Sequence, residues 1–440
     1  MRNYLLAGAQ TQQGLTLPRA CWRAAAQIGE RRARSGAMGT RLLCLCLAAA
    51  LLAYSAYTPL PPDFDQPWRV MLLSAAFRAG LRLVEVADWL GLVHFMDAMM
   101  LMTVAEYVEP TSDENVTVTD TEFSNVSVRL FLPRRVPEGL RRAVVFFHGG
   151  GWCLGQAGMK PYDRLSRWTS TRLNAVVVSV NYRLAPRYRF PVQFEDVYSV
   201  TKFFLQSRVL SQYGVDPARV CVAGDSAGGN LAAAVAQQLL EDPEVETELK
   251  AQALIYPALQ TIDLDLPSYR DNAEKPILPK SLMVRFWSEY FTSDPALREA
   301  MASNRHVPPE SAHLFQLVNW SSLLPEEMRH GHAYAGPRAG SPELARRFPG
   351  FLDARAAPLL VPDARLRRLP HTYVLTCQHD VLRDDGLMYV GRLRAAGVPV
   401  THYHARDAFH GSMMFVSGFS ELAVGHRLTN SYIQWLDENL

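Results

Sequence analysis

Six short apolar runs, rich in valine and phenylalanine, constrain the fold of this chain more than any other feature. Longer stretches with helical periodicity separate them, and the runs are residues 143–147, 175–180, 220–223, 253–256, 373–377 and 400–403. A strand that is apolar on both faces is buried on both faces, which is typical of a parallel sheet built from β-α-β units and covered by helices. The sequence therefore predicts an α/β protein with a mostly parallel sheet flanked by helices.

Three other segments extend this core. Residues 115–133 contain two short strand-like segments and predict a β-hairpin ahead of the first run. Residues 66–108 carry apolar side chains at helical spacing and predict two amphipathic helices. Their apolar face belongs either to an ordinary core or to a lid that faces lipid or substrate. Between about residues 263 and 358 the rhythm gives way to proline-rich helical fragments, so we expect an insertion that forms a second part of a helical cap.

Composition excludes several classes of protein. The chain has 440 residues, of which 48% are hydrophobic and 20% charged, so it is a globular protein rather than a disordered one. A net charge of +2 supports no nucleic-acid partner. The sequence contains no Walker loop, no dinucleotide fingerprint and no metalloprotease helix motif. We therefore expect no cofactor and no metal.

The strongest chemical motif is Gly224-Asp-Ser226-Ala-Gly228, which lies between a predicted buried strand and an alanine-rich helix. This G-x-S-x-G pattern in a strand-turn-helix context is the nucleophile elbow, in which a strained turn exposes the serine oxygen. Small flanking residues let the turn pack closely, and the following helix N-terminus favours negative charge. The pattern predicts that Ser226 is a nucleophile.

A run of glycines follows another predicted strand, in the segment His148-Gly149-Gly150-Gly151. Glycines in such a loop allow backbone N–H groups to face a cavity, as an oxyanion hole requires. We predict that this loop forms the oxyanion hole. The expected donors are the N–H groups of Gly149 and Gly150, together with that of Ala227 directly after the nucleophile.

The acid of a Ser…Asp…His triad is expected on the loop after residues 373–377. Asp380 is the first acidic residue past the end of that strand, so we predict that it is the triad acid. Asp384 and Asp385 are expected to be solvated or to lie in the first turn of a helix.

The base is expected near residues 400–410, where three histidines lie. His410 lies on the loop after the last predicted strand and is the better candidate for the general base. His402 and His404 are two residues apart and share one face of that strand, so we expect them to fill space or to be exposed. His379 precedes Asp380 and so breaks the triad order.

A segment of 21 residues without charge, from residue 42 to residue 62, predicts a membrane anchor. As a helix it would span about 31 Å, the thickness of a hydrocarbon core. Residues 1–41 hold seven arginines against one acid, and no positive charge directly follows the segment, so the N-terminal tail is expected in the cytoplasm. Residues 63–440 would then form a luminal catalytic domain.

Two alternatives to an uncleaved anchor remain open. A signal peptide cleaved near Ser55 would release the domain, and an arginine-rich mitochondrial presequence is a second alternative. Met38 is a possible second start, so residues 1–37 could be an extension arising from start-site choice. Three N-x-[ST] sequons, at Asn115, Asn125 and Asn319, support passage into a lumen and are expected glycosylation sites.

Several motifs together carry a family resemblance. The His-Gly-Gly-Gly-Trp segment, residues 181–186 (Asn-Tyr-Arg-Leu-Ala-Pro) and Gly-Asp-Ser-Ala-Gly-Gly resemble the hormone-sensitive-lipase group of esterases, in the α/β-hydrolase superfamily. Within that group the chain resembles the arylacetamide deacetylase branch from residue 38 onward. The segments that carry this closer resemblance are residues 57–61, 111–115, 282–290 and 382–386.

The resemblance implies a single-pass enzyme of the endoplasmic-reticulum membrane with a luminal catalytic domain. It implies hydrolysis of aryl acetamides and carboxylic esters, glycerolipids among them, by a triad of Ser226, Asp380 and His410 with the His148-Gly149-Gly150 oxyanion loop. One rival is a lipase or sterol-ester hydrolase with a preference for long chains. Another is a non-catalytic binding protein on the same fold, but such proteins tend to lose a triad member, and all three residues are present here.

Cysteine placement predicts one disulfide. Cys153 lies two residues past Gly151, and Cys377 lies three residues before Asp380, on two loops that must converge on the nucleophile. The resemblance implies the same pair, and the alternative is two unpaired thiols. Cys221, inside a predicted strand, is expected to be a buried free thiol.

Overall fold

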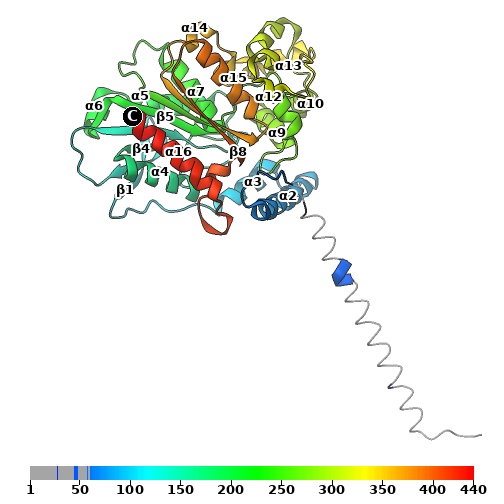
Figure 1. Cartoon of the computed structure of the whole chain (residues 1–440), viewed down its shortest axis with the longest axis horizontal. Helices are drawn as coiled ribbons and strands as arrows, with labels where there is room; N and C mark the ends of the chain where they lie inside the picture. Colours follow the sequence, from blue (N-terminus) through cyan, green and yellow to red (C-terminus); the bar gives the residue numbers. More distant parts are fainter. Residues whose placement is uncertain (1–26, 28–43, 48–56, 58–59) are drawn as a thin grey trace, which may run out of the picture. The chain divides into compact units, whose positions relative to one another are not determined.

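An eight-stranded sheet forms the centre of the molecule in this computed structural model, which describes residues 27, 44–47, 57 and 60–440 (Figure 1). The strands are ordered β1-β2-β4-β3-β5-β6-β7-β8. Pairs from β4 to β8 are parallel, whereas β2 pairs antiparallel with β1 and with β4. The predicted mostly parallel sheet and the hairpin ahead of it are confirmed. The strands are β1 Val116–Phe123, β2 Val126–Pro133, β3 Arg141–Phe147, β4 Val176–Val180, β5 Val215–Asp225, β6 Ala251–Ile255, β7 His371–His379 and β8 Val400–Phe409.

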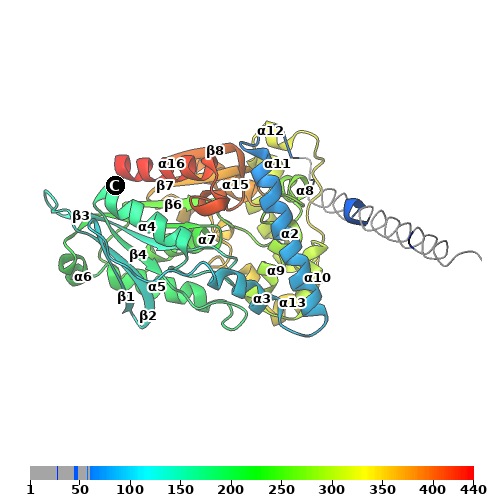
Figure 2. The ribbon, with the colours of Figure 1, turned by 90° about the horizontal axis from the view of Figure 1, so that it is seen from below.

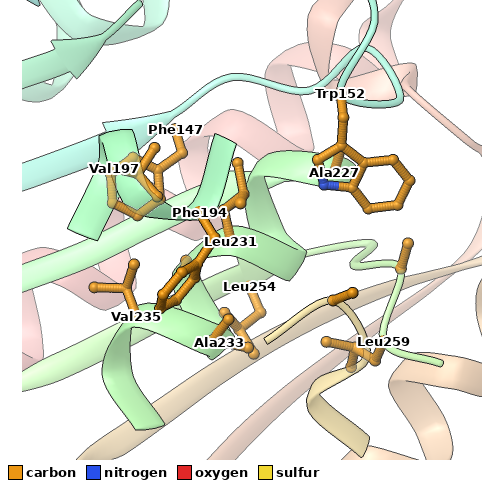
Figure 3. Close-up of a cluster of buried hydrophobic side chains, with 14 of the residues drawn as sticks. Phe147, Trp152, Phe194, Val197, Ala227, Leu231, Ala233, Val235, Leu254 and Leu259 are labelled. Atoms are coloured by element: carbon orange, nitrogen blue, oxygen red, sulfur yellow. The ribbon is translucent and has the colours of Figure 1, made fainter. Parts of the chain in front are cut away.

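Helices cover both faces of this sheet, which explains why its central strands are apolar at most positions. On one face, α5 and α7 pack together, with Phe194 and Val197 against Leu231 and Val235 (Figure 3). On the other face, α4 and α16 bury a second apolar cluster. The helices outside the cap are α4 Lys160–Leu173, α5 Val192–Phe204, α6 Ser207–Gln212, α7 Ala227–Leu239, α14 Asp363–Leu366, α15 Arg383–Ala395 and α16 Ala423–Asn439, with two 3-10 turns, η4 Ser412–Met414 and η5 Gly418–Ser420.

Two groups of helices gather at one end of the molecule. The first is α2 and α3, and the second is the insertion between β6 and β7, which contains helical segments and no strand among the described residues. Figure 2 shows α2 and α3 beside α9 and α10. The groups touch where Arg285 of α9 donates to Asp88 of α2 at 2.8 Å and lies 3.7 Å from the ring centre of Phe95. Their bounds are α2 Pro67–Trp89, α3 Phe95–Val104, α8 Pro267–Asp271, α9 Lys280–Phe291, α10 Pro295–Ala302, η1 Pro309–Val318, α11 Trp320–Leu323, α12 Glu326–Arg329, α13 Pro342–Arg347, η2 Pro349–Leu352 and η3 Pro358–Leu360.

The predicted anchor at residues 42–62 lies mostly outside the described residues. Of that segment the structure describes residues 44–47, 57 and 60–62. Across the described part of the chain, no helix has both the length and the apolar character needed to cross a bilayer.

Candidate active site

Ser226 lies at the sharp turn between β5 and α7, with a φ of 56° and a ψ of −118°. A φ in this range is rare for a residue with a side chain and marks a strained position. The neighbouring glycines are required by close packing. A Cβ on Gly224 would lie 2.3 Å from the carbonyl oxygen of Gly228, and one on Gly228 would lie 1.9 Å from that of Phe147. The local sequence thus builds the turn that presents the Ser226 hydroxyl.

The structure brings the three predicted triad residues together at the carboxyl ends of the strands. The Ser226 hydroxyl oxygen lies 2.8 Å from Nε2 of His410, and Nδ1 of His410 lies 2.8 Å from Oδ2 of Asp380. Oδ1 of Asp380 accepts the backbone N–H of Leu382 at 2.8 Å, which fixes the carboxylate. All three side chains are buried. An alternating serine, imidazole and carboxylate in this geometry can activate the hydroxyl as a nucleophile.

The neighbouring acidic residues have structural positions. Asp384 and Asp385 lie in the first turn of α15, the second of the two expected placements, and both are fully buried rather than solvated. Asp384 accepts the backbone N–H of Ser268 at 2.7 Å, and Asp385 accepts that of Leu259 at 2.9 Å. Each carboxylate accepts a buried backbone N–H, which compensates for its removal from water.

The two other histidines of β8 contact a threonine of β7 and not the triad. Oγ1 of Thr376 lies 2.8 Å from Nε2 of His402 and 2.9 Å from Nδ1 of His404. Burial lowers the pKa of both imidazoles to about 4, so both are neutral near pH 7. No group of side chains able to hold a metal ion occurs among the residues that the structure describes.

The glycine loop differs from the prediction in its donors. The N–H of Gly149 donates to Oδ1 of Asp225 at 2.8 Å, so it points into the protein and is not free to bind an oxyanion. Gly150, Gly151 and Ala227 instead line the pocket in front of Ser226. Position 150 requires glycine, because its φ is 105° and a Cβ there would lie 2.2 Å from the Leu154 carbonyl oxygen. Of this loop, Gly150 and Gly151 rather than Gly149 thus lie beside Ser226 with no carboxylate bound to them.

His148 supports the loop from behind rather than facing substrate. Its ring stacks on Tyr182 with centroids 4.3 Å apart, and its Nδ1 lies 2.8 Å from the carbonyl oxygen of Gly149. Burial lowers the pKa of His148 to about 4, so the ring is neutral near pH 7. The hydroxyl of Tyr182 donates to the carbonyl of His148 at 2.7 Å. His148 thus helps to hold the backbone of the glycine loop in place.

Asp225 is a positioning residue that was not predicted from the sequence motifs. Besides holding Gly149, its carboxylate accepts the hydroxyl of Tyr162 at 3.3 Å. Burial raises the pKa of Asp225 to about 7, although the bonds from Gly149 and Tyr162 act in the opposite direction. A signal was present in the sequence, because Asp225 lies inside the Gly-Asp-Ser motif next to the nucleophile.

We expect Asp225→Ala to lower kcat about 100-fold, the loss typical of one oxyanion donor, because the glycine loop loses its anchor. Asp225→Asn should stay within a few-fold of wild type, since the amide oxygen can still accept from Gly149. Steady-state hydrolysis of a water-soluble acetyl ester measures both variants. An alanine variant as active as wild type would show that the loop does not depend on Asp225.

The same aspartate predicts a pH effect on stability. Its pKa rises from 3.8 to about 7 on folding, so the folded state binds the proton more tightly than the unfolded state. The corresponding stabilisation is present at low pH and is lost as the pH rises through that interval. Denaturant unfolding at several pH values should show that the free energy of unfolding declines less with rising pH in Asp225→Asn than in wild type.

The pocket in front of Ser226 is apolar and has a volume of about 280 Å³. Both groups of end helices contribute to it, with Phe77 from α2, Met99 from α3 and Phe286 from α9. Five methionines are among its lining residues, and methionine side chains adapt to ligands of different shapes. Such a pocket suits an apolar acyl or aryl group beside the nucleophile.

The segment before α2 supports both catalytic loops from outside the pocket. Phe64 is buried and stacks on His379, next to Asp380, with ring centroids 4.5 Å apart, and it lies 6.1 Å from Phe409, next to His410. Nε2 of His379 lies 3.1 Å from a carboxylate oxygen of Asp63. Nothing in the sequence motifs indicated this contact, because its partners are more than 300 positions apart.

Comparison with known proteins agrees with this geometry. A family profile described as alpha/beta hydrolase fold matches residues 144–317 and 328–414. The chain belongs to the alpha/beta-hydrolase family. It is 58% identical over 402 residues to arylacetamide deacetylase of Oryctolagus cuniculus, which covers 91% of this chain and 100% of that protein. It is also 46% identical to neutral cholesterol ester hydrolase 1 of Pongo abelii, over 91% of this chain and 100% of that protein.

Solved structures give the same result for the fold. An esterase of Pyrobaculum calidifontis matches with a TM-score of 0.57 and 26% identity, over 86% of this chain and 99% of that one. With the arylacetamide deacetylase relatives, this shows that the hydrolase is of the carboxylesterase and amidase type. The resemblance drawn from the sequence motifs is confirmed.

The predicted disulfide between Cys153 and Cys377 is wrong. Both residues are buried free thiols. Cys153 belongs to the apolar cluster shared with the end helices, whereas Cys377 belongs to the cluster on the opposite face of the sheet. The two cysteines flank converging loops, but their side chains point to different sides of the sheet. Cys221 is a buried free thiol, as expected.

Proposed function

We propose that this hydrolase cleaves aryl acetamides and carboxylic esters through an acyl-enzyme on Ser226. The observation that carries the proposal is the hydrogen-bonded series Ser226, His410 and Asp380 at the base of an apolar pocket. The relative named arylacetamide deacetylase, at 58% identity over its whole length, supports the substrate class.

The geometry supports a two-step acyl transfer. His410 takes the proton of Ser226 as the hydroxyl oxygen attacks the substrate carbonyl, and Asp380 holds the imidazole and stabilises its cation. The backbone N–H groups of Gly150, Gly151 and Ala227 face the developing oxyanion. His410 then protonates the leaving amine or alcohol, and water repeats the sequence on the acyl-enzyme. The reaction needs no cofactor.

Pocket size favours small substrates over sterol esters. A volume of about 280 Å³ lies at the lower limit of ligand pockets, which range from about 300 to 1,000 Å³. The second candidate is a hydrolase of long-chain or sterol esters, with glycerolipids among its possible substrates. The relative named neutral cholesterol ester hydrolase 1 supports this candidate.

A hydrolysis panel decides between the two. We expect kcat/KM for an acetanilide and an acetyl ester to exceed that for the matching oleoyl ester, with Ser226→Ala inactive on all three. A preference for the oleoyl ester would replace the first candidate by the second. Absence of labelling by a fluorophosphonate would instead favour a non-catalytic binding protein.

We further propose that residues 42–62 anchor the chain once in the endoplasmic-reticulum membrane. The support is the uncharged segment itself and the seven arginines before it, which place residues 1–41 in the cytoplasm and residues 63–440 in the lumen. The end helices within residues 66–108 and 263–358 then serve as a cap over the pocket. The lipid bilayer is a partner of the protein in this arrangement.

Luminal placement predicts glycosylation. Asn115 and Asn125 are exposed, and Asn319 is partly exposed. We expect endoglycosidase treatment of microsomal protein to increase its gel mobility, with a smaller shift after each Asn→Gln substitution. Protease added to sealed vesicles should leave the catalytic domain intact. Unchanged mobility together with digestion of the domain would place it in the cytoplasm.

A further inference from the structure

The outward side of α2 is apolar along its whole length. Its exposed apolar residues follow one another at intervals of three, four or seven positions, which places them on one side of the helix. They are Trp68, Leu72, Ala79, Leu83, Val86 and Leu90. Val70, Ser74, Leu81 and Val84 face the protein and are buried, whereas the residues of the outward stripe stay exposed to solvent.

The apolar surface continues past the end of α2. Trp89 is 82% exposed and Leu92 is 74% exposed, and on α3 Leu101 is 69% exposed. Soluble proteins rarely expose contiguous apolar patches of this kind unless the patch binds something. We call the exposed apolar side chains of α2, α3 and the turn between them the α2–α3 face.

This face adjoins the substrate pocket. Met102 is 44% exposed and is also one of the residues that line the pocket. Met99 and Phe77, on the inner sides of the same two helices, line the pocket as well. The helices that carry the outer apolar surface therefore form one wall of the cavity in front of Ser226.

The preceding chain indicates which partner covers the face. The uncharged segment of 21 residues ends at Pro62, and α2 begins at Pro67, so four residues separate an anchor in the bilayer from this helix. Four residues span at most about 14 Å, so α2 must start at the membrane surface if the segment is embedded. Tryptophans near the two ends of the stripe, Trp68 and Trp89, and arginines on its flanks are typical of helices that lie in a lipid interface.

We propose that the α2–α3 face lies in the interfacial layer of the bilayer and that neutral, poorly water-soluble esters and amides enter the pocket from the lipid beside Met102. The entry of substrate rests on the proposed hydrolase activity, whereas the lipid contact rests on the proposed anchor at residues 42–62 and not on that activity. Burial of this face in lipid removes apolar surface from water without any protein partner.

Fluorescence quenching tests the lipid contact without using activity. The full chain is reconstituted into phosphatidylcholine nanodiscs with brominated acyl chains, which quench only nearby tryptophans. We expect clear quenching relative to unbrominated lipid, and we expect Trp68→Phe with Trp89→Phe to remove most of it. Trp168→Phe, on α4, is the matched control and should leave the quenched fraction unchanged. Equal quenching with and without Trp68 and Trp89 would overturn the proposal.

Kinetics test the entry of substrate from lipid. Leu83→Glu with Trp89→Glu places two charges on the face, and both side chains are more than 70% exposed, so core packing is preserved. Both the variant and the wild type retain residues 42–62, so a difference reports on the face rather than on the anchor. We expect turnover of the acetate of a long-chain alcohol, dissolved in vesicles, to fall about tenfold, the effect of losing the burial of one apolar side chain. Hydrolysis of a water-soluble acetyl ester should stay within about twofold of wild type, because this substrate enters from water and surface substitutions change the fold little.

The control variant is Val136→Glu, at an apolar residue that is 85% exposed outside the face. It should match wild type on both substrates. Equal losses on both substrates in the Leu83 and Trp89 variant would show that the face only supports the fold, and this would overturn the proposal. So would a dimer that dissociates in this variant without any lipid quenching, because a second copy would then occupy the face. A wild type that hydrolyses neither substrate but is quenched would refute the proposed function and leave the lipid contact standing.

Discussion

Ser226→Ala is expected to lower kcat by about a million-fold while the protein still folds. The hydroxyl oxygen of Ser226 lies 2.8 Å from Nε2 of His410, and Ser226 lines the pocket. Alanine removes only this oxygen and is compatible with the tight turn that Gly224 and Gly228 form. Ester hydrolysis and fluorophosphonate labelling measure the loss, and thermal unfolding checks the fold.

Non-additivity provides the control for this result. His410→Ala should cost nearly as much as Ser226→Ala, and the double variant should be scarcely worse than either, because triad members act as a unit. Independent losses that multiply in the double variant would show that Ser226 and His410 do not share one reaction step.

The strands and the nucleophile turn could be predicted because local sequence determines both. Residues 175–180 and 220–223 are apolar at nearly every position that the sheet buries, so their placement needs no tertiary information. The turn at Ser226 requires glycine on both sides, and a glycine pair at that spacing between a strand and a helix is typical of a nucleophile elbow. The order of Asp380 and His410 along the chain then followed from the fold.

The oxyanion donors could not be assigned because three consecutive glycines carry equivalent N–H groups. The buried carboxylate of Asp225 accepts the N–H of the first glycine, Gly149, whereas Gly150 and Gly151 line the pocket. The contact between Gly149 and Asp225 joins residues that are 76 positions apart in the chain, so the local sequence does not indicate it. The third glycine, Gly151, completes the pocket wall against Phe286, whose ring a Cβ would meet at 2.3 Å.

The prediction of a disulfide between Cys153 and Cys377 was wrong for a related reason. Alternation along β7 sends Tyr373, Leu375 and Cys377 to the same face of the sheet, where α16 covers them. Proximity of two loops in the chain topology does not determine which face a side chain enters, and a bridge needs Cα atoms within about 7 Å. The burial of Asp384 and Asp385 was also missed, because the loops that donate to them come from the insertion side of the sheet.

Asp380→Asn is expected to lower kcat about 10,000-fold, with little change in the thermal unfolding midpoint. Oδ1 of Asp380 would still accept from Leu382, so the loop keeps its shape. An amide group facing Nδ1 of His410 donates a hydrogen bond instead of accepting one, which leaves the proton on Nε2. The imidazole can then no longer take the proton of Ser226, and the rate of fluorophosphonate labelling should fall with kcat.

Asp384→Asn is the matched control for this acid, since both carboxylates are fully buried and only four positions apart. Asp384 contacts Ser268 and Arg383 rather than an imidazole, so its variant should lose stability while the folded fraction keeps its turnover. Breaking its buried ion pair with Arg383 costs about 3–5 kcal/mol by analogy with other proteins, enough to lower the unfolding midpoint measurably. Near-normal turnover in Asp380→Asn, together with lost turnover in folded Asp384→Asn, would transfer the role of the acid to Asp384, against the 2.8 Å contact between Asp380 and His410.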